Sequence, residues 1–139
     1  MLDLNLITDR TAADVETGTD KGYYRHTDMN RVQAAVVALR ARFVAAGYSL
    51  PETPALSTWY LNDIPRRARM ERYLRSVRAF DGVLAPVRTG AAFPSTMDGL
   101  DWRGANAIEE FLDRVDRAED AVEGAWFYCD EPFSGEVDV

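Results

Sequence analysis

The stretch TDMNRVQAAVVALRARFVAAG, residues 27–47, decides the fold class. Its apolar residues recur at steps of three and four, which places them on one face of an α-helix. Thr27 can accept a hydrogen bond from a free amide of the first turn, and Gly47 is typical of the residue that follows a helix. We therefore expect an amphipathic helix near residues 28–46. The apolar face consists of Met29, Val32, Val36, Leu39, Phe43 and Ala46.

Two further stretches carry the same spacing and predict helices near residues 66–84 and 103–123. Pro65 suits the first turn of the earlier helix, and Pro86 ends its pattern. In the later stretch Glu119 interrupts the apolar face, and Gly124 is the expected end. The apolar residues are Met70, Tyr73, Leu74, Val77, Phe80 and Leu84 in the earlier stretch and Ala105, Ile108, Leu112, Val115 and Val122 in the later one.

Three amphipathic helices bury their apolar faces most economically around one core, so the sequence predicts a mainly α protein, a three-helix bundle. A fourth, short helical turn is expected in TDRTAADVE, capped by Thr8 or Asp9. The connections at residues 48–64 and 87–100 are long and contain prolines and tryptophans, which favours loops that pack on the bundle. We expect residues 1–125 to form the bundle domain and residues 126–139 to form a short β-hairpin or an extended arm.

Composition limits the function classes. The chain has 139 residues, enough for one core, and a formal net charge of −7, which is unfavourable for a protein that binds nucleic acid through phosphates. A single cysteine excludes an internal disulfide. The first residues, MLDLNLITDRT, do not resemble a signal peptide, and no apolar run approaches the ~18 residues of a membrane span. We expect a soluble protein made in the cytoplasm, without export and without membrane contact.

The stretch DIPRRARMERYLRSVRAF, residues 63–80, concentrates six arginines in this acidic chain. On a helix, Arg69, Arg72, Arg75 and Arg78 spread across the whole polar side. A helix that reads DNA would place its cations on one ridge beside residues able to read bases, so nucleic acid is an unfavoured partner. A solvated face and charge pairing with an acidic surface remain as alternatives.

An acidic surface of this kind is expected on the last helix, where carboxylates follow steps of four and three. Such like charges destabilise a helix unless solvent screens them or cations offset them. We predict that at least one of the four arginines pairs with one of these acids, in the same chain or in a neighbour. A metal site is a weaker interpretation, because residues in one stripe do not converge as ligands do. The acids are Glu109, Asp113, Asp116, Asp120 and Glu123.

The C-terminal segment AWFYCDEPFSGEV is dense in aromatic residues, with Trp126, Phe127, Tyr128 and Phe133. Exposed aromatics at this density are typical of an interface. The alternative is that they fold back and cap the bundle.

The sequence carries no recognisable catalytic motif. His26 is the only histidine, and Cys129 lies in the aromatic segment, where a small apolar filler is the simpler interpretation. Phosphate-binding glycine motifs and zinc-type Cys/His spacings are both missing from the sequence. We predict a non-enzymatic protein with no cofactor and no metal.

The ordered blocks LITDRTAADV, KGYYRHTDMNRV, DIPRRARMERYLRSVRA, FPSTMDGLDWRGANAIEEFL and WFYCDEPFSGEV resemble a small uncharacterised module of phage and prophage structural-gene regions from gut bacteria. The resemblance covers nearly the whole chain. It departs from the module at Arg66, where a threonine is common, and at Cys129–Asp130, where Ser-Gly is common. It implies a tail- or baseplate-associated virion protein that forms a homo-oligomer and contacts other phage structural proteins.

The resemblance also implies that polar residues in these blocks act as helix caps and loop anchors rather than as catalytic groups. Arg10 and Asp9 are expected to attach the N-terminal segment to a helix end. An alternative function is a small regulatory protein whose arginine-rich helix binds nucleic acid or an acidic protein. The expected caps and anchors are Thr27, Asp28, Asn30, Asp63 and Asn106.

Overall fold

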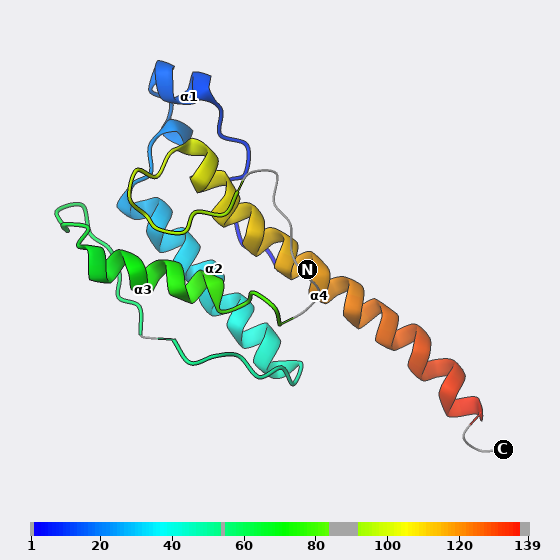
Figure 1. The fold of residues 1–139 in the computed structure, drawn as a ribbon. Helices are drawn as coiled ribbons and strands as arrows, with labels where there is room; N and C mark the ends of the chain where they lie inside the picture. The colour runs from blue at the N-terminus through cyan, green and yellow to red at the C-terminus, as the bar shows by residue number, and fades with distance from the viewer. Residues whose placement is uncertain (1, 54, 84–91, 137–139) are drawn as a thin grey trace.

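The computed structural model describes residues 2–53, 55–83 and 92–136, with side chains described up to residue 124. Within these residues the chain is mainly helical and contains no strand, as predicted (Figure 1). The elements in chain order are α1 (Ala12–Thr17), the 3-10 helix η1 (Asp20–Gly22), α2 (His26–Ala45), α3 (Arg67–Arg78) and α4 (Trp102–Glu136).

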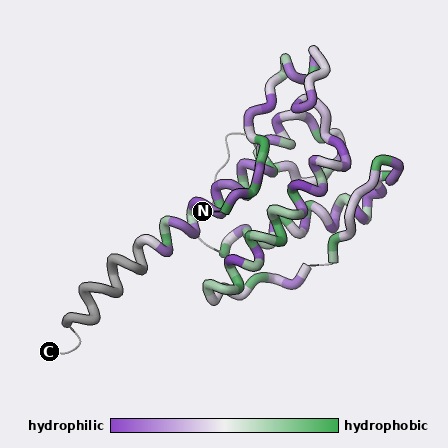
Figure 2. The backbone as a smooth tube through the Cα atoms, turned by 180° about the vertical axis from the view of Figure 1, so that it is seen from behind, coloured by the Kyte–Doolittle hydropathy of each residue, from purple (hydrophilic) through white to green (hydrophobic). Residues whose placement is uncertain are grey.

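One hydrophobic core joins α2, α3 and α4, and all three predicted apolar faces contribute to it. Hydrophobic and hydrophilic residues alternate along the helices, as expected where one face is buried (Figure 2). Ala46 is exposed and Val122 only partly buried, so the core fades toward those helix ends. The most completely buried apolar side chains are Val32, Leu39, Phe43, Val77, Ile108 and Leu112.

The start of α2 differs from the prediction. Thr27 lies inside the helix, and Arg25 is the residue before its first turn. The carboxylate of Asp28 accepts a hydrogen bond from the Arg25 amide at 2.7 Å, which satisfies a donor at the helix start. A side chain three residues into the helix therefore caps it, in place of the threonine.

The end of α2 is as predicted. Gly47 has φ 94°, its amide donates to the Val44 carbonyl at 3.0 Å, and the Tyr48 amide donates to the Phe43 carbonyl at 3.0 Å. This pair of bonds is the Schellman arrangement, which satisfies free carbonyls at a helix end. The rings of Phe43 and Tyr48 lie 5.0 Å apart and supply the apolar contact that accompanies it.

The other helix boundaries depart from expectation by several residues. α1 is capped by Thr11, which accepts from the Asp14 amide, and not by Thr8 or Asp9. α3 ends at Arg78 rather than near residue 84, and residues 84–91 lie outside the described residues, Pro86 among them. α4 passes Gly124 and reaches Glu136. The aromatic hairpin or arm expected over residues 126–139 falls beyond the described side chains and stays a prediction.

The loop between α2 and α3 packs on the bundle, as its composition predicts. Trp59 is buried, and its indole donates to Gln33 at 2.8 Å. Asn30 holds the Trp59 backbone from both sides, with two hydrogen bonds of 2.8 Å. Asn30 is therefore a loop anchor, one of the two roles predicted for it. In the second connection, Phe93 packs against Phe111 with 5.3 Å between the ring centroids.

The N-terminal segment lies along α4 in the opposite direction. The Leu2 amide donates to Asp116 at 2.9 Å, and the Ile7 amide donates to Glu109 at 3.1 Å. Asn106 exchanges two hydrogen bonds with the Arg10 backbone, of 3.0 and 2.8 Å. Leu2, Leu4 and Leu6 pack against the core at every second residue. That alternation in the sequence is typical of an extended segment with one buried side.

Candidate functional site

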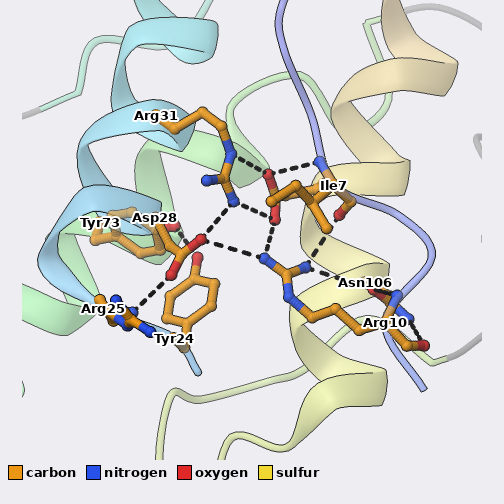
Figure 3. A network of polar contacts seen from close by, with 9 residues as sticks. Ile7, Arg10, Tyr24, Arg25, Asp28, Arg31, Tyr73 and Asn106 are labelled. Carbon is orange, nitrogen blue, oxygen red and sulfur yellow. Dashed lines mark hydrogen bonds and ion pairs between the residues drawn. The ribbon is translucent and has the colours of Figure 1, made fainter. Parts of the chain in front are cut away.

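A buried carboxylate, Glu109 of α4, is the centre of an ion network (Figure 3). It accepts from Arg10 at 2.5 Å and from Arg31 through two nitrogens at 2.9 and 3.0 Å. The Ile7 amide supplies a further bond. Both carboxylate oxygens are thus occupied by protein donors, which leaves Glu109 without a free position for a substrate or a metal ion.

Asp28 closes the network on the α2 side. Its carboxylate lies 2.7 Å from Arg31 and 3.6 Å from Arg10. Two arginines and two acids from α2, α4 and the N-terminal segment therefore neutralise each other away from solvent. Burial of an unpaired charge is costly, so removal of any one of the four side chains is expected to destabilise the fold. This arrangement is structural in character.

Two tyrosines lie beside the network. The hydroxyls of Tyr24 and Tyr73 are hydrogen-bonded, and the Arg10 guanidinium lies 5.6 Å from the Tyr24 ring centroid. Burial raises the pKa of both hydroxyls well above the ordinary value. At neutral pH both therefore stay protonated and act as hydrogen-bonding core residues rather than as bases.

A second ion cluster joins α2 to the middle of α4. Arg42 contacts Asp116, Asp120 and Glu123, the last two at 2.6 and 3.1 Å. Three of the five acids predicted for the stripe thus share one cation, and that cation comes from α2. Asp113 pairs with Arg117 of its own helix at 3.0 Å.

The predicted pairing of the α3 arginines with α4 acids is wrong within the chain. Over the described residues, no ion pair joins Arg69, Arg72, Arg75 or Arg78 to α4. Arg69 pairs with Asp63 at 3.2 Å and covers the Trp59 ring at 3.6 Å. The physical reason is that the acidic side of α4 faces α2 and the N-terminal segment. The arginines of these two elements, Arg10, Arg31 and Arg42, pair with the acids of α4. Pairing with a neighbouring copy stays a prediction.

The remaining α3 arginines face outward. Arg78 donates to the Pro94 carbonyl at 2.8 Å and lies 5.3 Å from the Phe93 ring centroid, so it fastens the second connection. Arg72 and Arg75 are exposed. They lie on the polar side of α3, as predicted.

An apolar groove opens between the starts of α2, α3 and α4. It has a volume of about 590 Å³. Three methionines, Met29, Met70 and Met97, line it together with Trp59 and Leu100. Tyr60 and Leu61 form its outer rim and are 66% and 78% exposed. The groove was not predicted from the sequence, because its residues come from two helices, α2 and α3, and from the three segments that precede α2, α3 and α4. The clustering of YLNDIP between two helices, with large apolar residues in a loop, was the available signal.

Of the other residues considered for function, His26 lines the groove. The side chains of Trp126, Phe127, Tyr128, Cys129 and Phe133 lie outside the described part of the chain. Among the described residues, no three His, Cys, Asp or Glu side chains are grouped closely enough to hold a metal ion. In the same part of the chain, no helix has the length and apolar character that a membrane crossing requires.

Comparison with protein-family models, with curated proteins and with solved structures found no match to this chain.

Proposed function

We propose that this protein is a non-enzymatic assembly module that works through protein–protein contacts. The observation that carries the proposal is the contrast between its buried and its exposed chemistry. The buried ionisable groups of the Glu109 network pair with one another, and Arg10 Nε is its one buried polar side-chain atom without a hydrogen-bond partner among the described residues. The three most exposed large apolar residues of the described part, Leu61, Ile64 and Tyr60, share one loop beside the groove and are 78%, 70% and 66% exposed. Large apolar residues that share one exposed loop are typical of an interaction site.

The ordered sequence blocks support a more specific form of the proposal. They resemble a module of phage structural-gene regions, so the assembly is a tail or baseplate and the chain is a virion protein. The chain forms a homo-oligomer with copies of itself and contacts other phage structural proteins. This form of the proposal accounts for a small fold that devotes its charged residues to stability and leaves an apolar rim uncovered.

The test is whether the chain is part of the particle. Prophage induction in a strain that carries the gene, followed by particle purification and quantitative mass spectrometry, is expected to find the chain at a fixed copy number per particle. A matched control is a cytoplasmic protein of similar abundance, which should be depleted. If the chain is depleted to the same degree as the control, the virion role is wrong.

Exposed arginines favour a second candidate function, a regulatory protein that binds nucleic acid or an acidic protein. Arg72 and Arg75 are exposed, and within the described residues no ion pair joins them. This function requires an affinity for duplex DNA that falls steeply as salt rises. A fluorescence titration at several salt concentrations, with the double variant Arg72→Ser/Arg75→Ser as control, separates it from the assembly function, which requires no DNA affinity.

A further inference from the structure

We propose that the apolar groove is the receptor for the aromatic C-terminal segment, residues 126–139, of a second copy of this chain. The inference rests on the proposed assembly function and names the two surfaces that meet.

The groove has the character of a peptide receptor. Its floor is formed by Met29, Met70, Met97 and Trp59, and its volume is about 590 Å³. Methionine side chains are unbranched and polarisable, so a methionine-rich floor adapts to bulky aromatic side chains. Binding of an amphipathic segment in such a groove is an established mode of peptide recognition.

Cations stand at the edge of the groove. Arg25 lines it directly, and Arg67 lines a hollow that shares Pro65, Met70 and Met97 with it. Both arginines are exposed and pair with exposed acids, Arg25 with Asp20 at 3.0 Å and Arg67 with Asp98 at 3.3 Å. Exposed pairs of this kind contribute little, so their cations are free to exchange partners. The one acid in the groove, Asp63, is neutralised by Arg69.

The C-terminal segment complements these features. Residues 126–139 contain four aromatic residues and four acids, and neither lysine nor arginine. Trp126 and Phe133 are seven residues apart, which is two helical turns and the usual spacing of anchors in a groove. Pro132 and Gly135 disfavour a helix, so this part of α4 gains little stability from propensity alone. In the proposed contact, docking in the groove stabilises the conformation of this segment.

Distance assigns the segment to another copy. The groove lies at the start of α4, where Gly99 and Leu100 line it. α4 has 35 residues, so its far end lies on the order of 50 Å from that start. In Figure 1, α4 starts beside the other helices and extends beyond them at its C-terminal end. One end of each copy therefore carries the groove and the other carries the segment. Such a head-to-tail contact forms rings or filaments, which suits a virion component.

Two full-length variants test the proposal by complementation. A groove variant, Tyr60→Glu/Leu61→Glu, changes exposed rim residues and so leaves the core intact. A segment variant, Trp126→Ser/Phe133→Ser, removes both anchors. The wild type is expected to self-associate in light scattering, and each variant alone is expected to be monomeric. Mixed together, the two variants are expected to form a 1:1 pair that stops at two chains, because one groove and one segment remain intact.

A labelled peptide of residues 125–139 gives an independent readout. The peptide is expected to bind the segment variant, and to bind the groove variant with an affinity lower by about tenfold or more. Its affinity for the segment variant is expected to fall as the salt concentration rises. A scrambled peptide and the variant Val37→Glu, altered at an exposed α2 residue outside the groove, are the controls. Self-association of either variant alone, absence of the 1:1 pair, or equal peptide binding by both variants would overturn the inference. If the chain is nevertheless found in purified particles, only the inference fails and the assembly function stands.

Discussion

The Glu109 side chain has no contact with solvent. Its carboxylate is paired with two arginines from different parts of the chain. Arg10 approaches from the N-terminal segment and Arg31 from α2. Removal of one member of a buried ion set leaves the others charged and unpaired, which costs more than the set contributes as a whole. The network therefore makes the docking of the N-terminal segment and the packing of α2 on α4 interdependent.

This dependence predicts a large difference between neighbouring residues. Glu109→Gln removes the charge while nearly preserving the shape, and is expected to lower the free energy of unfolding by about 3–5 kcal/mol. The control is Glu110→Gln, because Glu110 pairs with Arg114 nearer the surface, where an ion pair is worth about 0–1 kcal/mol. Urea unfolding followed by circular dichroism measures both. Equal shifts of the two midpoints would show that the network does not stabilise the fold.

Glu119 presents the opposite case, a buried carboxylate with an oxygen that has no hydrogen-bond partner. Burial raises its pKa above the ordinary value of 4.5, the Tyr48 hydroxyl and Arg42 act in the other direction, and Glu123 adds to the increase. A raised pKa means that the folded state favours the protonated form of the carboxyl over the charged form. Its contribution to stability is therefore lost as pH rises above 4.5 and through the raised pKa.

Replacement by glutamine is expected to remove this loss. Glu119→Gln should stabilise the protein at pH 7 relative to the wild type, and the advantage should shrink as pH falls toward 4.5. Thermal unfolding of both proteins between pH 4.5 and 7.5 measures the difference, with Glu52→Gln, at an exposed loop position, as the control. A difference that does not change with pH would mean that the Glu119 carboxyl titrates normally.

At the scale of the elements, the end of α2 is the best-defined boundary, because Gly47 combines a positive φ with two carbonyl-satisfying hydrogen bonds. A Cβ added at Gly47 would meet no atom within 4 Å, so any cost of substitution comes from the backbone alone. Left-handed backbone costs an ordinary L-residue about 1–2 kcal/mol, and asparagine less. The wild type is expected to have the highest melting temperature, Gly47→Asn a lower one and Gly47→Ala the lowest. If Gly47→Ala melts at the wild-type temperature, the boundary does not depend on this conformation.

Helix positions could be predicted from the sequence because burial of one helix face requires apolar residues at regular spacing along the chain. The steps of three and four from Met29 to Phe43 are created by the same helix that they predict. Helix starts were harder, since the Asp28 carboxylate and the Thr27 hydroxyl are both suitable caps, and only the packing of Asp28 against Arg31 decides between them. The groove was hidden for a related reason, because its residues come together only after three helices pack.

Partner choice among charges could not be predicted. The sequence left open whether solvent or cations offset the acids of the α4 stripe. In the structure Arg42 pairs with three of them and Arg10 and Arg31 with Glu109, and over the described residues none of the four predicted α3 arginines pairs with the stripe. Attraction between exposed charges is weak and unspecific, so charge complementarity does not select one arginine-bearing element over another. The geometry of the bundle selects it. The alternation of Leu2, Leu4 and Leu6 was the one local signal that the N-terminal segment covers α4.

At the scale of the whole molecule, the core and the C-terminal segment are separate in sequence. The core residues run from Met29 to Val115 and include Trp59 of the first long loop. Arg42 ties α4 to α2 as far as Glu123. The predicted division into a domain of residues 1–125 and a terminal arm of residues 126–139 stays a prediction.

Deletion of residues 126–139 therefore tests the organisation of the molecule. The shortened chain is expected to unfold cooperatively with a midpoint close to that of the full chain, because the buried core and both ion clusters are retained. It is also expected to lose self-association in light scattering and cross-linking, since the proposed contact between copies is removed. Circular dichroism should fall only by the share of the deleted helical residues. A larger loss of helix would show that the aromatic segment caps the bundle of its own chain, and an arm that docks on another copy would then be wrong.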